Sequence, residues 1–269
     1  MDPLTERTPR VVSAVKLLRT VERRKVGRFL VEGENSVGEA LDTRPVHDLF
    51  YTEDAEQRYA RLIDRAHTAG VRTSLVTDRA VRALSDTVTP PGLVAVCDLL
   101  DVPLAEAIGP GTRLLAVPVA VAEPGNAGTV IRVADAVGAD AAILAGDSVD
   151  PHNGKCVRAS AGSLFHLPVV RERDTAAVLD SISAAGIQLL ATAADGEVDL
   201  DDADELLARP TAWLFGNEAH GLDAATSARA DYRVRIPIHG RAESLNLATA
   251  ASICLYSSAR VQNRKRTDS

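Results

Sequence analysis

The chain has 269 residues, a net charge of −7, 46% apolar residues and 3% aromatic residues. This length is sufficient for two domains, and an apolar content dominated by Ala, Val and Leu suits helices packed on a parallel sheet. No apolar run approaches the roughly 18 residues of a membrane span, and the charged start MDPLTERTPR does not resemble a signal peptide. We therefore expect a globular, cytoplasmic α/β protein with no membrane partner.

The first feature along the chain is a basic segment from Arg7 to Arg28, which holds eight Lys/Arg and the single acid Glu22. The last ten residues, RVQNRKRTDS, add four basic residues, whereas the chain between the two segments is acidic. Positive charge segregated on an acidic protein is one way to bind nucleic acid. A solvated helix and a frayed tail would explain the same charge equally well.

Residues 28 to 99 alternate short apolar runs with helical patterns. Predicted strands cover 28–33, 46–52, 71–77 and 92–99, and predicted helices cover 34–41 and 53–70. This alternation predicts a small α/β sandwich. The following segment, 98–113, is rich in Pro and Gly and indicates a linker. We therefore place a domain boundary near residue 105, which gives domains 1–105 and 106–269.

The second domain has five nearly continuous apolar runs, as expected for a parallel sheet covered on both faces. These predicted strands lie at about 113–121, 140–145, 187–193, 211–215 and 232–236. The predicted helices lie at about 127–138, 155–161, 174–185, 222–229 and 245–261. The last helix is rich in Ala, Ser and Thr, which allow close packing against another element or a second subunit.

The first candidate site is EPGNAGTVIR, residues 123–132, between a predicted strand and a predicted helix. Its two glycines do not have the G-x-G-x-x-G spacing of a dinucleotide site, and no G-K-[ST] of a phosphate loop follows. A nicotinamide-dependent oxidoreductase is therefore excluded. The segment leaves an amide, Asn126, and a guanidinium, Arg132, beside the strand end, where a helix cap and a surface ion pair are the structural alternative.

Two further strand ends carry polar groups: WLFGNEAHGLD, residues 213–223, and RIPIHGRAESLNLATAAS, residues 235–252. Loops at the carboxyl ends of parallel strands are where open α/β folds bind ligands. An ordinary turn with a solvated Glu218 is the alternative for the first segment. In the second, Ser244 sits where a helix N-cap belongs, and Asn246 falls in the first turn.

Metal and covalent hydrolase chemistry have no pattern in this sequence. The six histidines form no metal-ligand spacing, and no G-x-S-x-G nucleophile elbow is present. The cysteines, Cys97, Cys156 and Cys254, are widely separated, and we expect three reduced structural thiols. We expect no metal cofactor.

The three polar segments, in this order and spacing, resemble the motifs of the SpoU family of S-adenosylmethionine-dependent RNA ribose 2′-O-methyltransferases, of the SPOUT superfamily. The matching stretches are PGNAGTVIRVADAVGA, LFGNEAHGL and IPIHGRAESLNLATAAS. In addition, GRFLVEGENSVGEAL resembles the family's substrate-binding domain, and VRASAGSLFHLPV resembles its ribosomal-RNA branch, including the thiostrepton-resistance type. The chain departs from the family at Glu123, where Asp is frequent, and at Asn217, where Ser is frequent.

The resemblance implies a parallel α/β domain with a deep trefoil knot, which is rare among folds, and a homodimer. It implies that S-adenosylmethionine is bound by Thr192, Leu214, Phe215, Gly216, Asn217, Ile236, Ile238, Ser244 and Leu245. It implies a catalytic set of Arg132, Asn126, Glu218, Ser244 and Asn246. For RNA binding we expect the basic residues Arg19, Arg23, Arg24, Lys25, Arg28 and Arg158.

The resemblance implies methyl transfer from S-adenosylmethionine to a ribose 2′-hydroxyl of RNA, and we expect 23S ribosomal RNA as the substrate. Arg132 is the family's suspected activator of that hydroxyl, but a guanidinium stays protonated in proteins. We therefore expect Arg132 to bind the adjacent phosphate and stabilise the developing alkoxide while the proton leaves to phosphate or water. A transfer-RNA ribose methyltransferase and a non-catalytic RNA-binding protein are the alternatives, because the three motifs concern the donor rather than the target.

Overall fold

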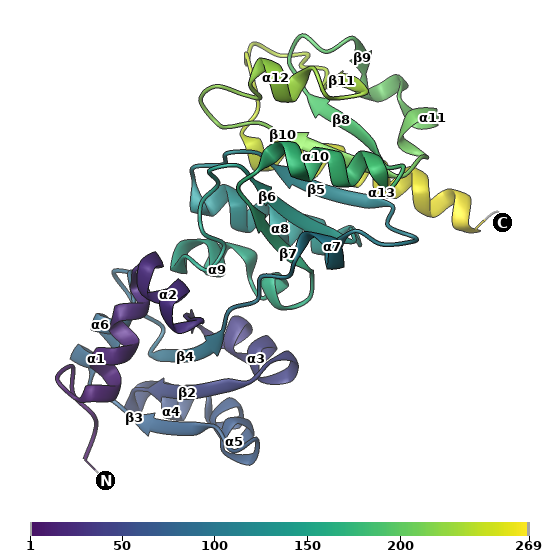
Figure 1. The fold of residues 1–269 in the computed structure, drawn as a ribbon. Coiled ribbons are helices and arrows are strands. Elements are labelled where there is room, and N and C mark those ends of the chain that lie inside the picture. The colour runs from purple at the N-terminus through teal and green to yellow at the C-terminus, as the bar shows by residue number, and fades with distance from the viewer. Residues whose placement is uncertain (1, 268–269) are drawn as a thin grey trace. The chain divides into compact units, whose positions relative to one another are not determined.

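A computed structural model describes the backbone of residues 2–267 and the side chains of residues 2–264 (Figure 1). The chain forms two compact units: Met1–Leu100 together with Asp150–His166 make unit 1, and Asp101–Val149 together with Leu167–Ser269 make unit 2. Each unit has its own sheet. The segment 150–166 packs with unit 1, and the boundary near residue 105 stays a prediction. Within the described residues, no helix is long and apolar enough to cross a bilayer.

The sheet of unit 1 has four strands in the order β1-β4-β2-β3. The strands are β1 Arg28–Glu32, β2 Val46–Tyr51, β3 Arg72–Leu75 and β4 Leu93–Asp98. The central strand β4 is antiparallel to both β1 and β2, whereas β3 runs parallel to β2. All four predicted strands are confirmed, with no end displaced by more than two residues.

The helices of unit 1 cover both faces of this sheet. They are α1 Pro9–Val15, α2 Thr20–Val26, α3 Glu34–Thr43, α4 Glu53–Arg58, α5 Ala60–Thr68, α6 Asp78–Leu84 and α9 Gly154–Ser160. One core joins α1 and α6 to the sheet through Val11, Phe50 and Leu84, among others. The single helix expected at 53–70 divides at Tyr59 into α4 and α5. The helix expected at 155–161 is α9, and it packs against β1 of unit 1.

A buried ion pair holds the start of segment 150–166 within unit 1. Arg23 is only 2% exposed, and its Nη2 donates to Asp150 Oδ2 at 2.7 Å. The same guanidinium donates to the carbonyl oxygens of Leu17 and Leu18, both at 2.9 Å. Burial raises the pKa of Asp150, but hydrogen bonds and charge from His152 and Arg23 outweigh it and hold that pKa well below its usual range.

The sheet of unit 2 has seven strands in the order β7-β6-β5-β10-β8-β11-β9, and every strand pair is parallel. The strands are β5 Leu114–Pro118, β6 Ala141–Ala145, β7 Val169–Glu172, β8 Gln188–Thr192, β9 Val198–Asp199, β10 Thr211–Phe215 and β11 Tyr232–Arg235. The predicted parallel sheet and the positions of its five predicted strands are confirmed, but β11 contains two arginines and is only partly buried. Strands β7 and β9 were not expected. Because the strands are parallel, the carboxyl ends of β5, β8, β10 and β11 lie at one edge.

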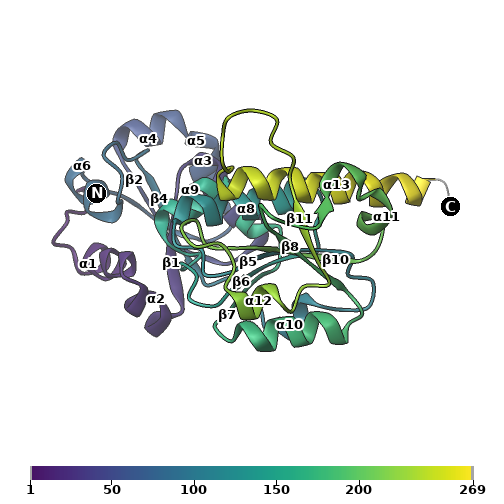
Figure 2. The ribbon, with the colours of Figure 1, turned by 90° about the horizontal axis from the view of Figure 1, so that it is seen from above.

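Helices lie on both faces of this second sheet, with α13 and α10 on opposite sides in Figure 2. The helices are α7 Leu104–Ala107, α8 Pro124–Ala136, α10 Thr175–Ala184, α11 Asp204–Leu207, α12 Ala224–Ser227 and α13 Leu247–Thr267. Helix α13 packs against α8 and against β5 and β10. Trp213 on β10 is fully buried, donates to Ser258 Oγ at 2.8 Å and stacks on Phe215. The trefoil knot stays a prediction, and the second half of the predicted basic tail, residues 265–269, lies outside the described side chains.

Candidate functional site

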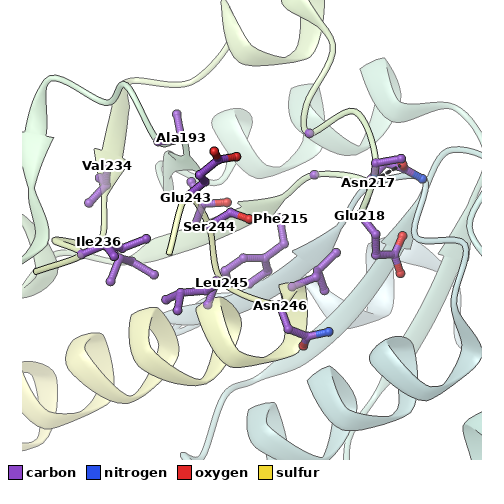
Figure 3. Close-up of a pocket in the computed structure, with 18 residues that line it drawn as sticks. Ala193, Phe215, Asn217, Glu218, Val234, Ile236, Glu243, Ser244, Leu245 and Asn246 are labelled. Atoms are coloured by element: carbon purple, nitrogen blue, oxygen red, sulfur yellow. Dashed lines mark hydrogen bonds between the residues drawn. The ribbon is translucent and has the colours of Figure 1, made fainter. Parts of the chain in front are cut away.

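A cavity of about 580 Å³ opens at the carboxyl edge of the unit 2 sheet, in the size range of small-molecule sites. Its walls are the ends of β8, β10 and β11, the loop 216–221 after β10 and the loop 236–246 that leads into α13. Figure 3 shows side chains from these separate segments facing the same space. The cavity therefore joins the second and third polar segments of the sequence, which lie on successive loops.

The lining of this cavity is apolar with negative charge. Phe215, Val234, Ile236 and Leu245 supply apolar surface, as adenine-like rings require. Among the 18 lining residues there are two carboxylates, Glu218 and Glu243, and no Lys or Arg. A phosphate-bearing ligand would lack any cationic partner there. A ligand with an apolar ring system and a positive charge suits this lining better.

The loop after β10 folds back so tightly that position 216 has no room for a side chain. A Cβ on Gly216 would lie 2.2 Å from the carbonyl carbon of Gly221 and 2.3 Å from the nitrogen of Leu222. Asn217 and Gly221 close the loop by exchanging backbone hydrogen bonds of 3.0 and 2.9 Å. The Asn217 side chain also donates to the Ala120 carbonyl oxygen at 2.7 Å, which attaches the loop to the end of β5.

Glu218 is held by hydrogen bonds rather than left free in this loop. Its carboxylate accepts from the backbone N–H groups of Ala122 and Glu123, each at 3.1 Å, and from Asn126 Nδ2 at 2.9 Å. Partial burial raises the pKa of Glu218, but these hydrogen bonds together lower it below its usual range. The carboxylate is therefore a weak base whose oxygens are already engaged, which suits a positioning role.

Asn246 extends this chain of hydrogen bonds to the third segment. Its Nδ2 donates to Asn126 Oδ1 at 3.1 Å, and its Oδ1 accepts from the backbone N–H groups of Ala248 and Thr249 at the start of α13. Asn126 on α8 therefore bridges Glu218 and Asn246, so the three polar segments of the sequence meet in one network. The expected cap at Ser244 is wrong, because α13 begins at Leu247 and Asn246 caps it.

The remaining predicted catalytic residues lie near the network in different ways. Ser244 lines the cavity with Glu218 and Asn246. Arg132 is exposed on α8 and does not line the cavity. Within the described part of the chain, Arg132 makes no hydrogen bond or ion pair, so its guanidinium keeps its donors for another molecule.

Eight of the nine predicted donor-binding residues line the cavity: Thr192, Phe215, Gly216, Asn217, Ile236, Ile238, Ser244 and Leu245. Leu214 does not, because alternate residues of a strand face opposite ways and its side chain is buried in the core on the other face. Sequence reasoning missed small lining residues such as Ala193 and Ala219, which carry no signal of their own. It also missed Glu243, whose place in the third segment could have indicated it.

The predicted RNA-binding residues differ in their exposure and in whether they already pair with a carboxylate. Arg19, Arg24 and Lys25 are exposed, and Arg28 is half-buried 3.5 Å from Asp98. Arg23 lies in the buried pair with Asp150 described above. Arg158 contacts Glu32 and Asp86.

The thiols and acids form no metal centre in the part of the chain that the structure describes. No group of three His, Cys, Asp or Glu side chains there could bind a metal ion. Cys97, Cys156 and Cys254 are free and buried, and burial raises the pKa of Cys97 to about 12. None of the three cysteines lines the cavity.

Comparison with known proteins connects both units to RNA methylation. The SpoU rRNA Methylase family profile matches residues 113–256, and an MRM3-like substrate binding domain matches residues 8–95. The chain is 36% identical to the 23S rRNA (guanosine(2553)-2′-O)-methyltransferase RlmP of Bacillus subtilis, over 90% of this chain and 92% of that protein.

Two solved structures with bound S-adenosylmethionine have the same fold over nearly their whole length. The rRNA methyltransferase from Sinorhizobium meliloti superposes with a TM-score of 0.84 and 30% identity, over 96% of this chain and 97% of that one. The SpoU methyltransferase AviRb from Streptomyces viridochromogenes gives a TM-score of 0.84 and 32% identity, over 97% and 100%.

Proposed function

Because the chain belongs to the SpoU rRNA methylase family, we propose that it transfers the methyl group of S-adenosylmethionine to a ribose 2′-hydroxyl of ribosomal RNA. The observation that carries this proposal is the cavity at the carboxyl edge of the unit 2 sheet. Its apolar walls, two carboxylates and absence of Lys or Arg among the lining residues fit a donor that has an adenine and a sulfonium but no phosphate. AviRb and the S. meliloti enzyme, which align over nearly the whole chain, bind this donor.

S-adenosylmethionine supplies, when bound, an electrophilic methyl group on a positively charged sulfur. The apolar side chains Phe215, Ile236 and Leu245 would bind its adenine, and the tight loop at Gly216 would offer backbone groups. Glu218 and Glu243 give the cavity the negative charge that favours a sulfonium. The main catalytic contribution of these residues is orientation, because methyl transfer is an in-line displacement.

The acceptor hydroxyl needs help, since an alcohol is a weak nucleophile while it keeps its proton. Glu218 does not serve as the base, because its pKa is lowered and its oxygens accept three hydrogen bonds. Asn126, bridging Glu218 and Asn246, fixes the start of α8, the helix that carries Arg132. Arg132 would bind the neighbouring phosphate through its fork of donors and stabilise the alkoxide, with the proton leaving to phosphate or water.

The substrate proposed is 23S ribosomal RNA, the RNA for which the B. subtilis relative is named. A ribosomal substrate would place the enzyme in the cytoplasm. We also propose a homodimer in which α13 supplies contacts, because this helix is rich in small residues and exposes Tyr256 by 64%. Sedimentation or light scattering of the purified protein tests the dimer, and a monomer at micromolar concentration would contradict it.

The test of the function is to incubate the protein with S-adenosylmethionine labelled in its methyl group, together with unmodified 23S RNA or with transfer RNA. The labelled nucleotide is located in the RNA sequence. The RNA is then digested to nucleosides to show whether the label is on the ribose or on the base. Label on one ribose of 23S RNA is expected. Label in transfer RNA alone would favour the transfer-RNA alternative, and no label in either RNA, with binding retained, would favour a non-catalytic RNA-binding protein.

A further inference from the structure

Unit 1 contains a groove of about 460 Å³ lined by residues of α1, α2 and the strands of its sheet. We call it the basic groove. Its charged lining residues are Arg10, Lys16, Lys25, Arg28 and Arg72 against Glu22 and Asp48. Five cations against two carboxylates give this lining a charge of +3, on a chain whose net charge is −7.

A buried carboxylate organises two of these cations. Asp48 is 8% exposed and accepts from Arg72 Nε at 2.7 Å and Arg72 Nη2 at 2.9 Å, and also from Arg10. Burial raises the pKa of Asp48, but its hydrogen bonds to the two guanidiniums and their charge outweigh this effect. The pKa of Asp48 therefore lies below its usual value, and the carboxyl stays ionised. One carboxylate thus fixes two guanidiniums and neutralises only one of their charges. Arg10 is further positioned over the ring of Phe50.

The other cations of the basic groove are more accessible. Lys16 and Lys25 are exposed, and neither has an ion-pair partner among the residues that the structure describes. Arg28 lies 3.5 Å from Asp98, which also contacts His47. The groove therefore combines two rigid guanidiniums with two free ammonium groups, an arrangement that suits repeated contacts to a polyanionic chain better than a single small anion.

We propose that the basic groove binds the phosphate backbone of the RNA substrate. This inference rests on the proposed function, because it identifies where unit 1 contacts the same RNA. It adds Arg10, Lys16 and Arg72 to the expected RNA-binding set. It leaves out Arg23, whose guanidinium is engaged inside the unit. Asp48 acts as a positioning residue for Arg10 and Arg72.

The experiment compares the wild-type enzyme with the double variant K16E/K25E in methylation of 23S RNA over a series of salt concentrations. We expect KM for RNA to rise at least about 10-fold, with kcat and the Kd of S-adenosylmethionine unchanged. The slope of log affinity against log salt concentration is negative, and each lost phosphate contact reduces its magnitude by about 0.7 to 0.9. R44E/R61E is the charge-matched control, since Arg44 and Arg61 are exposed in unit 1 and do not line the groove.

The outcomes separate this proposal from the proposed function. If wild-type protein methylates RNA but K16E/K25E has the same KM and salt slope as the control variant, the groove proposal is overturned and the function stands. If wild-type protein methylates no RNA, the function fails first. Unchanged affinity of K16E/K25E for naked RNA with poorer methylation of whole ribosomal subunits would assign the groove to a protein and also overturn the proposal. K16A/K25A repeats the test if charge reversal lowers the melting temperature.

Discussion

The cavity at the carboxyl edge of the unit 2 sheet and the basic groove of unit 1 are built in opposite ways. The cavity of unit 2 consists of loops at parallel strand ends, with no Lys or Arg in its lining and with a glycine where no side chain fits. The basic groove of unit 1 has five cationic side chains and two carboxylates, one of which, Asp48, is buried. If the basic groove binds RNA as proposed, this protein selects its small donor by shape and its RNA backbone by charge. A single substitution in the unit 2 cavity should therefore abolish most of the donor affinity, whereas each substitution in the basic groove should lower RNA affinity by a small step.

The largest loss of donor affinity is expected at Gly216. In Gly216→Ala the added Cβ would meet Gly221 and Leu222 at 2.2 to 2.3 Å, so the loop must open. We expect S-adenosylmethionine binding to weaken by about 1000-fold or more, roughly 4 kcal/mol, measured by calorimetry. Gly240→Ala is the control, because a Cβ there meets nothing within 4 Å. Equal donor affinity in the two variants would remove the shape argument.

Arg23 is an exception among the cations of unit 1, because it is buried and stabilises the fold through its ion pair with Asp150. Arg23→Met leaves Asp150 buried without its guanidinium, and we expect a loss of about 3 to 5 kcal/mol in the free energy of unfolding. Because the folded pKa of Asp150 lies below its usual range, this stabilisation is present at neutral pH and is lost as the pH falls through that lowered value. Urea denaturation at several pH values measures it.

The matched control for Arg23 is its neighbour. Arg24 lies on the same helix but is exposed, and Arg24→Met should change the free energy of unfolding by less than about 0.5 kcal/mol. If both variants lose the same stability, the buried pair is not what holds Asp150 in place.

Arg132 tests whether shape matters for a cation in unit 2. Arg132→Lys keeps the charge but loses the planar fork, and we expect kcat to fall about 100-fold, roughly 2.7 kcal/mol, with donor affinity unchanged. Single-turnover methylation is the measurement. Arg229→Lys, whose arginine pairs with Asp180 at the surface, should change kcat less than 2-fold, by about 0.4 kcal/mol. Unchanged turnover of Arg132→Lys would contradict the phosphate-binding role.

The smallest expected effect concerns Asn126. Asn126→Ala removes one donor from Glu218 and one acceptor from Asn246, and we expect kcat at neutral pH to fall about 10-fold. The pKa of Glu218 should rise toward its usual value, so the network is lost at a higher pH as the solution is acidified. The acid limb of the activity profile should therefore move to higher pH. Gln57→Ala, an exposed amide in unit 1, should leave the profile in place.

Much of the fold could be predicted because the central strands are uninterrupted apolar runs. The strands β5, β6, β8 and β10 are almost wholly buried and were expected at nearly their observed positions. By contrast β7, Val169–Glu172, ends in Arg and Glu and has no such signal. The packing of 150–166 with unit 1 depends on contacts such as Arg23 with Asp150, 127 residues apart, which no local pattern reveals.

The site could be predicted as three polar segments but not as a network. Each segment follows a strand, and parallel strands bring their carboxyl ends together. The hydrogen bonds that join the segments link Asn126 to Glu218 and Asn246 across 92 and 120 residues. These contacts, and not the residue types, show that Glu218 accepts from Asn126, that Asn126 links Glu218 to Asn246, and that Asn246 caps α13. Residue type alone assigned the cap to Ser244, because Ser and Asn are equally good caps.

Trp213 makes the unit 2 site observable without any added label. It is the single tryptophan of the chain, buried on β10, hydrogen-bonded to Ser258 and stacked on Phe215, which lines the cavity. Its emission comes from one known place, so a change in intensity or wavelength on titration with a ligand reports on the wall of that cavity. The same signal, followed during dilution from denaturant, times the moment at which α13 closes over the sheet.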